Sequence, residues 1–257
     1  MINKELASIS FTDLEDLLAN AVGEFRTLEY KSQLNRGTRE EWIELLADIT
    51  AFANTAGGDL LFGVTEDRGE PTAFPGIEIN DWDALERNIS SLIRDGTQPR
   101  LQGVGLHRVS VSAGRYVLIV RVLRSYNRPH RVILGGHGHF YGRDSAQKYR
   151  LDVEELRRAF TLIAAASEMT NRFRLERVQR IGRNQGIMPV RQTVKAILHL
   201  VPDDALSREN ELDLASVQLP ELCPLPSAPL GYSDGIGLEA IYCYNEWAYT
   251  ALFRNES

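Results

Sequence analysis

The segment from residue 38 to residue 64 constrains the fold most, because a helix pattern, a pair of glycines and a strand pattern follow one another directly. Thr38 and Glu41 have the spacing of a capping box, and the apolar residues after them recur every three or four positions. This pattern predicts an amphipathic helix that ends at the glycine pair 57–58. The apolar run 59–64 then predicts a buried strand. A helix that leads directly into a buried strand is typical of a layered domain that mixes both elements.

Further segments continue this mixture. The predicted elements are helices over 12–20, 81–95, 152–163 and 168–183, and strands over 104–112, 115–123 and 139–143. Thr12 is the expected N-cap of the first helix, since Glu15 follows it by three residues. The helix that starts at Asp152 is expected to bury Phe160.

These elements predict an α+β fold class, a mixed sheet flanked by helices, for a first domain over residues 1–165. Residues 166–257 are expected to form a second region, with the basic helix 168–183 and a smaller C-terminal α/β part. Strands are expected there at 194–201 and within 240–253. Either this second region is small, or the chain is a piece of a longer protein.

The charge of the chain is distributed unevenly along the sequence. The 257 residues carry a net charge of -6, but residues 96–200 hold 19 Lys or Arg against 6 Asp or Glu, a net +13. A basic segment of this size is expected to bind a polyanion such as a nucleic acid. The alternative is that contacts with the acidic segments on either side, 1–95 and 201–257, cancel the charge within the fold.

Composition and the N-terminal sequence exclude other classes of protein. No apolar run approaches the length of roughly 18 residues that a membrane span needs. Residues 1–5 show no charged and apolar targeting pattern, and Cys223 and Cys243 are the two cysteines. We therefore expect a cytoplasmic protein with reduced thiols.

Three carboxylates are candidates for a chemical site. From Thr27 the sequence alternates, so Glu29 and Lys31 are expected to project from the same face of a strand. Glu24 can join Glu29 if it lies on the preceding turn, and Asp67 follows the exit of the strand predicted at 59–64. Three convergent carboxylates favour a hard divalent cation, Mg²⁺ or Mn²⁺, and with Lys31 they would suit phosphodiester hydrolysis. The alternative is a solvated acidic face, which such charges usually form.

Four stretches of the sequence resemble one known family. They are Glu24-x4-Glu29-Tyr30-Lys31, residues 47–64 (ADITAFANTAGGDLLFGV), residues 128–130 (RPH) and residues 140–145 (FYGRDS). In this order they resemble the Schlafen AlbA-like domain, and the resemblance covers about residues 15–165. It implies the α+β fold of that family. Family members include metal-dependent nucleases that cut tRNA and rRNA with two glutamates and an aspartate, and these positions match Glu24, Glu29 and Asp67.

Our first hypothesis is therefore a metal-dependent endoribonuclease that cleaves structured, tRNA-like RNA and serves as an effector of prokaryotic antiviral defence. Glu24, Glu29 and Asp67 would hold Mg²⁺ or Mn²⁺, and Lys31 would stabilise the transition state. Five arginines would hold the nucleic acid backbone: Arg121, Arg124, Arg128, Arg131 and Arg143. Vertebrate Schlafens clasp RNA with two related lobes, and this chain shows one copy, so we predict a homodimer. No zinc site of the Cys-x-x-Cys kind is present in the sequence.

The second hypothesis is a noncatalytic regulatory protein that binds DNA or RNA with the same basic segment. Many prokaryotic relatives of the Schlafen AlbA-like domain are described in those terms. Tyr126, Tyr141 and Tyr149 lie among the basic residues, which is compatible with stacking on bases. The tyrosines could equally cover the sheet.

Overall fold

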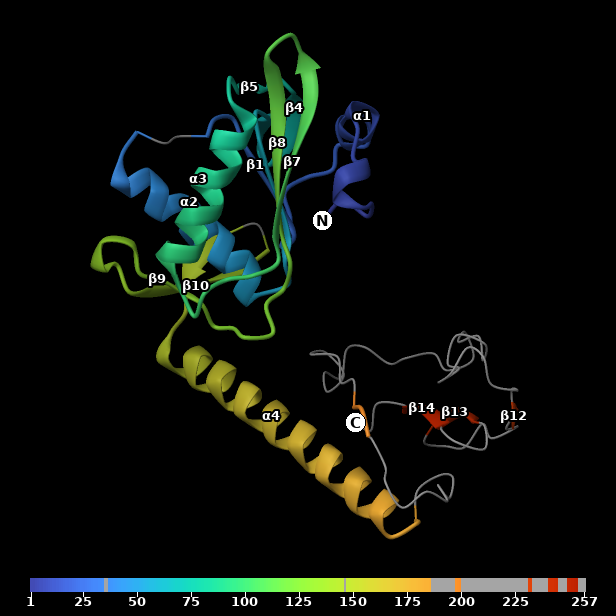
Figure 1. Cartoon of the computed structure of the whole chain (residues 1–257). Coiled ribbons are helices and arrows are strands. Elements are labelled where there is room, and N and C mark those ends of the chain that lie inside the picture. The colour runs from blue at the N-terminus through green and yellow to red at the C-terminus, as the bar shows by residue number, and fades with distance from the viewer. Residues whose placement is uncertain are drawn as a thin grey trace. The chain divides into compact units, whose positions relative to one another are not determined.

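The structure, a computed structural model, describes residues 1–34, 37–145, 147–185, 197–199, 231–232, 240–244 and 249–253 (Figure 1). It divides the chain into two compact units, Met1–Thr161 and Leu162–Ser257. The first unit contains a mixed sheet with helices on both faces, which confirms the α+β fold predicted from the sequence.

Five strands form the main sheet of the first unit. They are β1 (Leu28–Lys31), β2 (Gly58–Phe62), β5 (Ile77–Glu78), β7 (Val104–Ser112) and β8 (Arg115–Val122). β1 and β2 are parallel and are joined by a helix, whereas β8 runs antiparallel to β2, β5 and β7. The β7–β8 hairpin predicted from its short turn is therefore present. β1 lies at the edge of this sheet, where its side chains can meet other elements.

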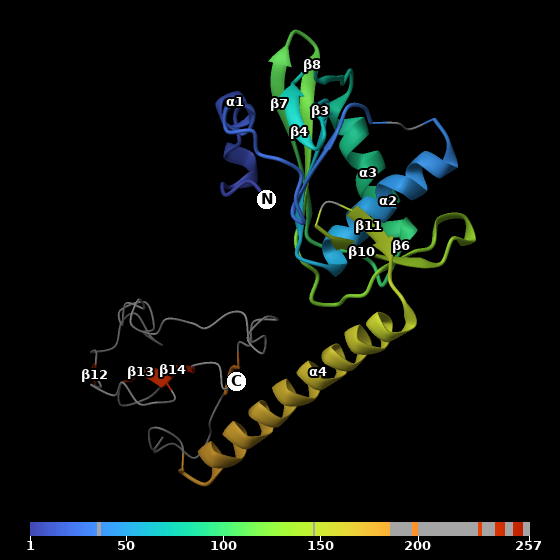
Figure 2. The same cartoon turned by 180° about the vertical axis from the view of Figure 1, so that it is seen from behind.

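Helices cover both faces of the main sheet (Figures 1 and 2). On one face lie α2 (Arg39–Asn54) and α3 (Trp82–Gly96), and on the other lie the short helix η1 (Leu6–Ser8) and α1 (Phe11–Ala19). The alternation of the strands supplies both cores: Leu60 of β2 packs toward α2 and α3, whereas Leu61 packs toward α1. The Thr38 and Glu41 capping box of α2 is formed as predicted.

The cap expected for the first helix was wrong. Ser10, not Thr12, is the N-cap of α1, and its backbone N–H donates to the Asp13 carboxylate at 2.7 Å. The helix begins one residue before Thr12 because Asp13, three residues after Ser10, completes the capping box.

A second, smaller sheet packs against α2 (Figure 2). Its strands are β6 (Thr97–Gln98), β9 (Arg131–Val132), β10 (His139–Asp144) and β11 (Gln147–Arg150), in the order β11-β10-β9-β6. Asn54, at the end of α2, joins the two parts: its side-chain amide donates to the carbonyls of His130 and Tyr141 at 2.9 and 2.8 Å. The hairpin of β3 (Thr65–Asp67) and β4 (Glu70–Ala73) and the short helix η2 (Leu134–Gly136) complete this unit.

The glycine pair after α2 is required by close packing. Gly57 has φ +73°, and a Cβ there would lie 2.8 Å from the carbonyl oxygen of Val122. A Cβ on Gly58 would lie 2.3 Å from the Phe52 ring. The pair therefore ends the helix and brings β2 directly under it, as the sequence predicts.

Two helices expected near the end of the first unit are one. α4 (Val153–Gly182) is continuous, because the residues between 163 and 168 are helical as well. Phe160 is not buried as expected: its side chain is exposed, with its ring at the edge of Phe140. None of the helices that the structure describes has the length and apolarity needed to cross a membrane.

In the second unit, β12 (Gly231–Tyr232), β13 (Ala240–Tyr244) and β14 (Tyr249–Phe253) form an antiparallel sheet. The strands expected within 240–253 are thus present. The strand expected at 194–201 lies largely outside the described residues, and residues 197–199 belong to no regular element.

Candidate functional site

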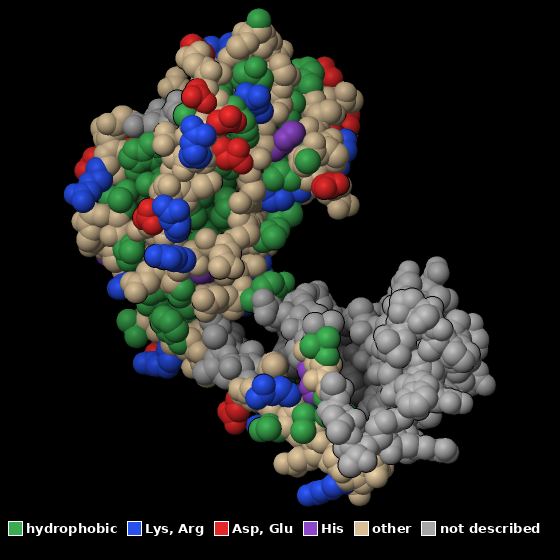
Figure 3. Space-filling view, in the orientation of Figure 1, with side chains coloured by type: hydrophobic (Ala, Val, Ile, Leu, Met, Phe, Trp, Pro, Cys, Tyr) green, Lys and Arg blue, Asp and Glu red, His purple; other side chains and the backbone are tan. Residues whose placement is uncertain are grey.

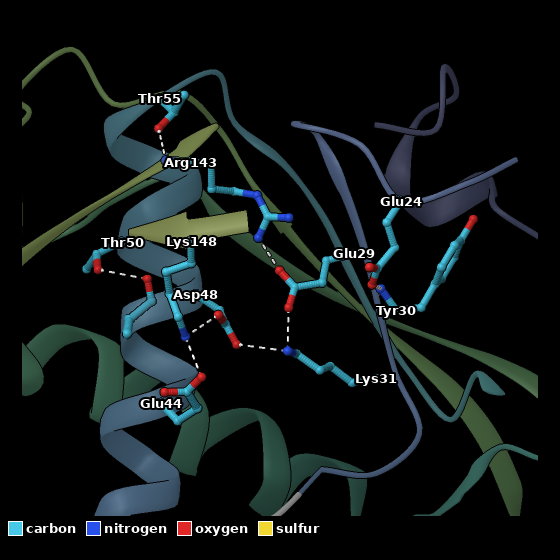
Figure 4. Close-up of polar contacts among 11 residues, drawn as sticks. Glu24, Glu29, Tyr30, Lys31, Glu44, Asp48, Thr50, Thr55, Arg143 and Lys148 are labelled. Carbon is cyan, nitrogen blue, oxygen red and sulfur yellow. Dashed lines mark hydrogen bonds and ion pairs between the residues drawn. The ribbon is translucent and has the colours of Figure 1, made fainter. Parts of the chain in front are cut away.

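Glu29 is the centre of a network of buried charges (Figure 4). It lies on β1, where Tyr30 points into the core beside α1 and Glu29 points the opposite way, toward α2 and β10. One carboxylate oxygen of Glu29 contacts the ammonium group of Lys31 and the other accepts a hydrogen bond from the Arg143 guanidinium. Glu29 and Lys31 therefore project from the same side of β1, as the alternation predicts, but the glutamate is only 7% exposed.

Arg143 reaches Glu29 from β10, on the second sheet. Its side chain is fully buried, with the guanidinium 4.4 Å from the centre of the Phe52 ring. Its backbone N–H donates to the Thr55 hydroxyl at 3.0 Å, which fixes β10 against the end of α2. A buried cation needs a counter-charge, and the Glu29 carboxylate supplies it.

Asp48 of α2 extends the network on the other side of Lys31. The Lys31 ammonium lies 3.7 Å from one oxygen of Asp48, and the Lys148 ammonium lies 2.5 Å from the other. Lys148, from β11, also contacts Glu44 at 2.5 Å. Elements that are far apart in the sequence thus contribute alternating charges to one site.

The network changes the protonation of its members. Burial alone raises the pKa of Glu29, but the charges of Lys31 and Arg143 outweigh it, so the pKa lies below its ordinary value. Burial would lower the pKa of Lys31, but Asp48 and Glu29 raise it overall. Burial and the charge of Glu29 raise the pKa of Asp48 to about 6. Near pH 7 Glu29 and Lys31 are therefore charged, and most Asp48 side chains are as well.

Glu24 is next to this network. It precedes the turn that leads into β1, and its backbone N–H donates to the carbonyl of Gly69 at 2.7 Å. Its Oε1 accepts a hydrogen bond from the Tyr30 N–H at 2.9 Å. The half-buried position of Glu24 raises its pKa, and the charges of Glu29 and then Glu66 raise it further. Glu24 and Glu29 therefore lie close enough for one charge to affect the other.

Asp67 lies on β3 in the hairpin whose Gly69 contacts Glu24, but its side chain is exposed, and its partner in the hairpin register is Glu70. Among the described residues, no group of three or more His, Cys, Asp or Glu side chains is arranged to hold a metal ion. The carboxylate chemistry suits Mg²⁺ or Mn²⁺, but both oxygens of Glu29 already contact cations of the protein. In this arrangement the residues do not fit a metal.

The five arginines expected to bind nucleic acid do not form one group. Arg143 is buried against Glu29, and Arg121 is 11% exposed, with its guanidinium paired to Asp59 at 2.7 Å. These two arginines do not present their guanidinium groups at the surface. Arg124, Arg128 and Arg131 are partly exposed. On the face seen in Figure 3, basic and acidic side chains are interspersed over the first unit.

Asp48, Lys148 and Glu44 are members of the site that were not predicted from the sequence. Asp48 had a signal, because it is an acidic residue between apolar positions on a helix face that is otherwise buried. A charge at such a position needs a partner, so Asp48 could have been recognised. Lys148 and Glu44 carry no comparable signal, since both lie on elements with exposed charged neighbours.

The raised pKa of Asp48 predicts a pH-dependent contribution to stability. Its pKa rises from 3.8 to about 6, so the folded protein keeps a proton that the unfolded chain has lost. This contribution is fully present below the unfolded pKa and disappears as the pH rises to about 6. Denaturant unfolding of wild type and Asp48→Asn is measured between pH 4 and pH 7. The free energy of unfolding of wild type minus that of the variant should decrease as the pH rises across this range. The exposed Glu86→Gln is the control, and a wild-type advantage that increases with pH would contradict the assignment.

The part of the chain that holds this network matches the model of a known family. The family model described as Schlafen, AlbA_2 matches residues 24–152, half of the chain. The chain belongs to the Schlafen AlbA_2 family. The matched residues begin at Glu24 and include Glu29, Asp48, Arg143 and Lys148, so the whole network lies within the Schlafen domain. Membership of this family indicates a role related to nucleic acids.

Two solved structures are similar to part of this chain. A protein from Corynebacterium diphtheriae has 19% sequence identity, a TM-score of 0.36, and coverage of 55% of this chain and 26% of its own. The N-terminal domain of a DNA helicase RecG-related protein from Nitrosomonas europaea has 26% identity, a TM-score of 0.37, and coverage of 54% and 92%. The chain thus spans about a quarter of the length of the first of these proteins. No curated protein matches the chain.

Proposed function

We propose that the Schlafen domain of this chain binds nucleic acid and acts as a metal-dependent endoribonuclease on structured, tRNA-like RNA. The observation that carries this proposal is the position of Glu24 and Glu29. Their carboxylates are close enough for the charge of Glu29 to raise the pKa of Glu24, and Lys31 contacts Glu29 directly. A pair of carboxylates beside an ammonium group is suited to cleavage of a phosphodiester.

The exposure of Lys31 and Glu24 to solvent supports a role in binding a ligand. Lys31 is about one-third exposed (35%) although both of its partners are nearly buried, so its ammonium group can meet a phosphate from solvent. Glu24 is half-buried and has one carboxylate oxygen, Oε1, held by Tyr30. The side chains therefore offer a cation and a carboxylate at the edge of β1.

The expected metal requires a different arrangement of these side chains. Glu29 would have to leave Lys31, Arg143 or both before it could ligate Mg²⁺ or Mn²⁺, and the exposed Asp67 would have to turn toward Glu24. The divalent ion, the homodimer and the role in antiviral defence stay predictions.

The second candidate is a noncatalytic protein that binds DNA or RNA. The ion pairs within the network favour this function, because the charged groups are already paired with one another. Arg143 is buried, and Asp48 and Glu29 neutralise Lys31 and Lys148. In that function the same Schlafen domain would contact phosphates without cleaving them.

Incubation of the purified full chain with total tRNA and Mn²⁺ distinguishes the two candidates. We expect discrete tRNA fragments, and we expect EDTA to abolish them, since phosphodiester hydrolysis by carboxylate sites depends on a divalent ion. Electrophoresis of the products and a parallel binding titration provide the readouts. Binding that weakens as salt increases, without fragments at any Mn²⁺ or Mg²⁺ concentration, would reject the nuclease and leave the binding protein.

A further inference from the structure

Two histidines and a tyrosine are in contact with one another at the start of β10. The rings of His137 and His139 meet edge to face, with their centres 4.6 Å apart. The Nε2 of His137 lies 2.6 Å from the Tyr141 hydroxyl, and these two rings are stacked, with 6.0 Å between their centres. Tyr141 is buried, whereas both histidines are partly exposed. The buried tyrosine therefore holds His137 in place, and the two imidazoles remain accessible to a ligand.

Basic side chains from two other elements surround these rings. Arg150 of β11 is exposed and is the partner of Tyr141 in the β10–β11 register, so both side chains lie on the same face of the second sheet. The Lys148 ammonium lies 6.0 Å from the centre of the Tyr141 ring. Arg39, at the start of α2, packs against η2, where a Cβ on Gly135 would lie 2.5 Å from the Arg39 Nε. The two histidines are therefore among cations.

The nearby carboxylates do not neutralise all of these cations. Glu44 and Asp48 of α2 both pair with Lys148. The guanidinium groups of Arg39 and Arg150 have neither an ion pair nor a hydrogen bond with another residue that the structure describes. Arg150 therefore keeps its N–H donors for a ligand, beside the two imidazoles.

The charges around His137 already act on its protonation. Burial lowers the pKa of His137, and the charges of His139 and then Arg150 lower it further. Arg131 of β9 does not face this residue, because it is the register partner of Phe140 on the opposite face and donates to Gln98 at 2.6 Å. A bound anion would reduce the repulsion between an imidazolium and the neighbouring cations. The arrangement therefore suits a negatively charged ligand.

We infer that His137, His139 and Arg150 form a phosphate site, which binds a phosphate group of the nucleic acid backbone. Arginine contacts phosphate oxygens through parallel N–H groups, and each imidazolium adds a charged donor. The phosphate site would supply a backbone contact that the buried Arg121 and Arg143 do not make. This inference rests on the proposed binding of nucleic acid and adds where the backbone lies. It does not depend on cleavage.

The pH dependence of RNA binding tests the phosphate site. Rhodamine-labelled tRNA is titrated with the full chain in EDTA between pH 5.5 and pH 8, and fluorescence anisotropy is the readout. Binding is expected to strengthen about tenfold as the pH falls, since raising one imidazole pKa by one unit corresponds to this change in affinity. The double variant His137→Gln/His139→Gln should lose this dependence. Arg150→Gln should weaken binding about tenfold at every pH and reduce its dependence on salt.

Two control variants match these changes. His107→Gln replaces a histidine of β7, whose Nε2 lies 2.9 Å from the Ile9 carbonyl, and should keep the pH dependence of wild type. Arg87→Gln removes an exposed arginine from α3 and should bind as wild type does. Equal loss of affinity in Arg87→Gln and Arg150→Gln would overturn the phosphate site, because it would show that any surface arginine contributes.

Inorganic phosphate tests the same site without RNA. Proton NMR follows the five histidine signals of the wild-type chain from pH 5 to pH 8, with and without phosphate at constant ionic strength. Two of the five signals are expected to titrate at a higher pH in phosphate, and both should be absent from the double variant. The wild-type measurement does not depend on whether a variant folds.

The outcomes separate this inference from the proposed function. Full pH dependence of RNA binding in the double variant would overturn the phosphate site and leave nucleic acid binding intact. Histidine signals that respond to phosphate in a chain that binds no RNA would reject the proposed function and assign the site to a free phosphate compound. A chain that binds neither RNA nor phosphate would overturn both. Binding with the expected pH dependence but without cleavage would reject only the nuclease.

Discussion

Replacement of Glu29 with glutamine is expected to reduce RNA cleavage by about 100-fold or more. Glutamine keeps the shape of the side chain but removes the charge that Lys31 and Arg143 contact. The loss therefore reports on the negative charge at this position and not on the space that it fills. The rate of fragment formation from tRNA in Mn²⁺ is the measurement.

Two further variants make this result interpretable. Glu70→Gln removes a carboxylate from the exposed hairpin opposite Asp67 and is expected to cleave at nearly the wild-type rate. Glu29→Gln also leaves the buried Arg143 without its counter-charge, which costs on the order of 3–5 kcal/mol for such a pair. The double variant Glu29→Gln/Arg143→Met removes both charges and should recover stability without recovering cleavage. Recovery of cleavage by the double variant, or full activity of Glu29→Gln, would exclude Glu29 from the chemistry.

A loss of stability of similar size is expected for Asp59→Ala. Asp59 is fully buried on β2, and its carboxylate accepts hydrogen bonds from Arg121 at 2.7 and 2.9 Å and from the Ile2 N–H at 2.6 Å. Arg121 also donates to the Ile2 carbonyl at 2.8 Å. Removal of the carboxylate leaves the nearly buried guanidinium of Arg121 without its counter-charge and the Ile2 N–H without its acceptor. The free energy of unfolding should therefore decrease by about 3–5 kcal/mol.

Urea unfolding of the full chain, followed by circular dichroism, measures this change. Asp95→Ala is the matched control, since it removes the pair with Arg94, in which both side chains are more than half exposed. That variant should unfold at the wild-type midpoint, because exposed pairs contribute little. An Asp59→Ala midpoint equal to wild type would show that the pair does not stabilise the first unit.

Local sequence signals were sufficient to predict the helices and strands whose ends depend on neighbouring residues in the sequence. The ends of α2 follow from the capping box at Thr38 and from the steric demand at Gly57 and Gly58, so both could be predicted. The continuity of α4 could not be predicted from the same rules, because its two apolar segments are separated by residues that interrupt the periodicity without breaking the helix. Alanine-rich stretches favour a helix whatever the pattern of apolar residues.

The candidate site was predictable in part. Alternation along β1 placed Glu29 and Lys31 together, which a period of two residues requires. The pairing of Glu29 with Arg143 joins residues 114 positions apart, and that of Asp48 with Lys148 joins residues 100 apart. Such contacts depend on how the second sheet packs on α2, so no local pattern predicts them. Arg121, which was expected at the surface, is held by Asp59 because β8 pairs with β2 in the main sheet, and this contact between residues 62 positions apart is not predicted by a local pattern either.

The separation of these partners also sets an order of events during synthesis of the chain. The ribosome makes Glu29, Lys31 and Asp48 about 100 residues before it makes Arg143 and Lys148. Until then β1 and α2 have two acidic side chains that become buried, Glu29 and Asp48, and one lysine at the place where the network later forms. Since burial of two carboxylates with one cation is unfavourable, this part of the nascent protein cannot close until β10 and β11 arrive. The Schlafen domain is therefore expected to complete its core late in translation.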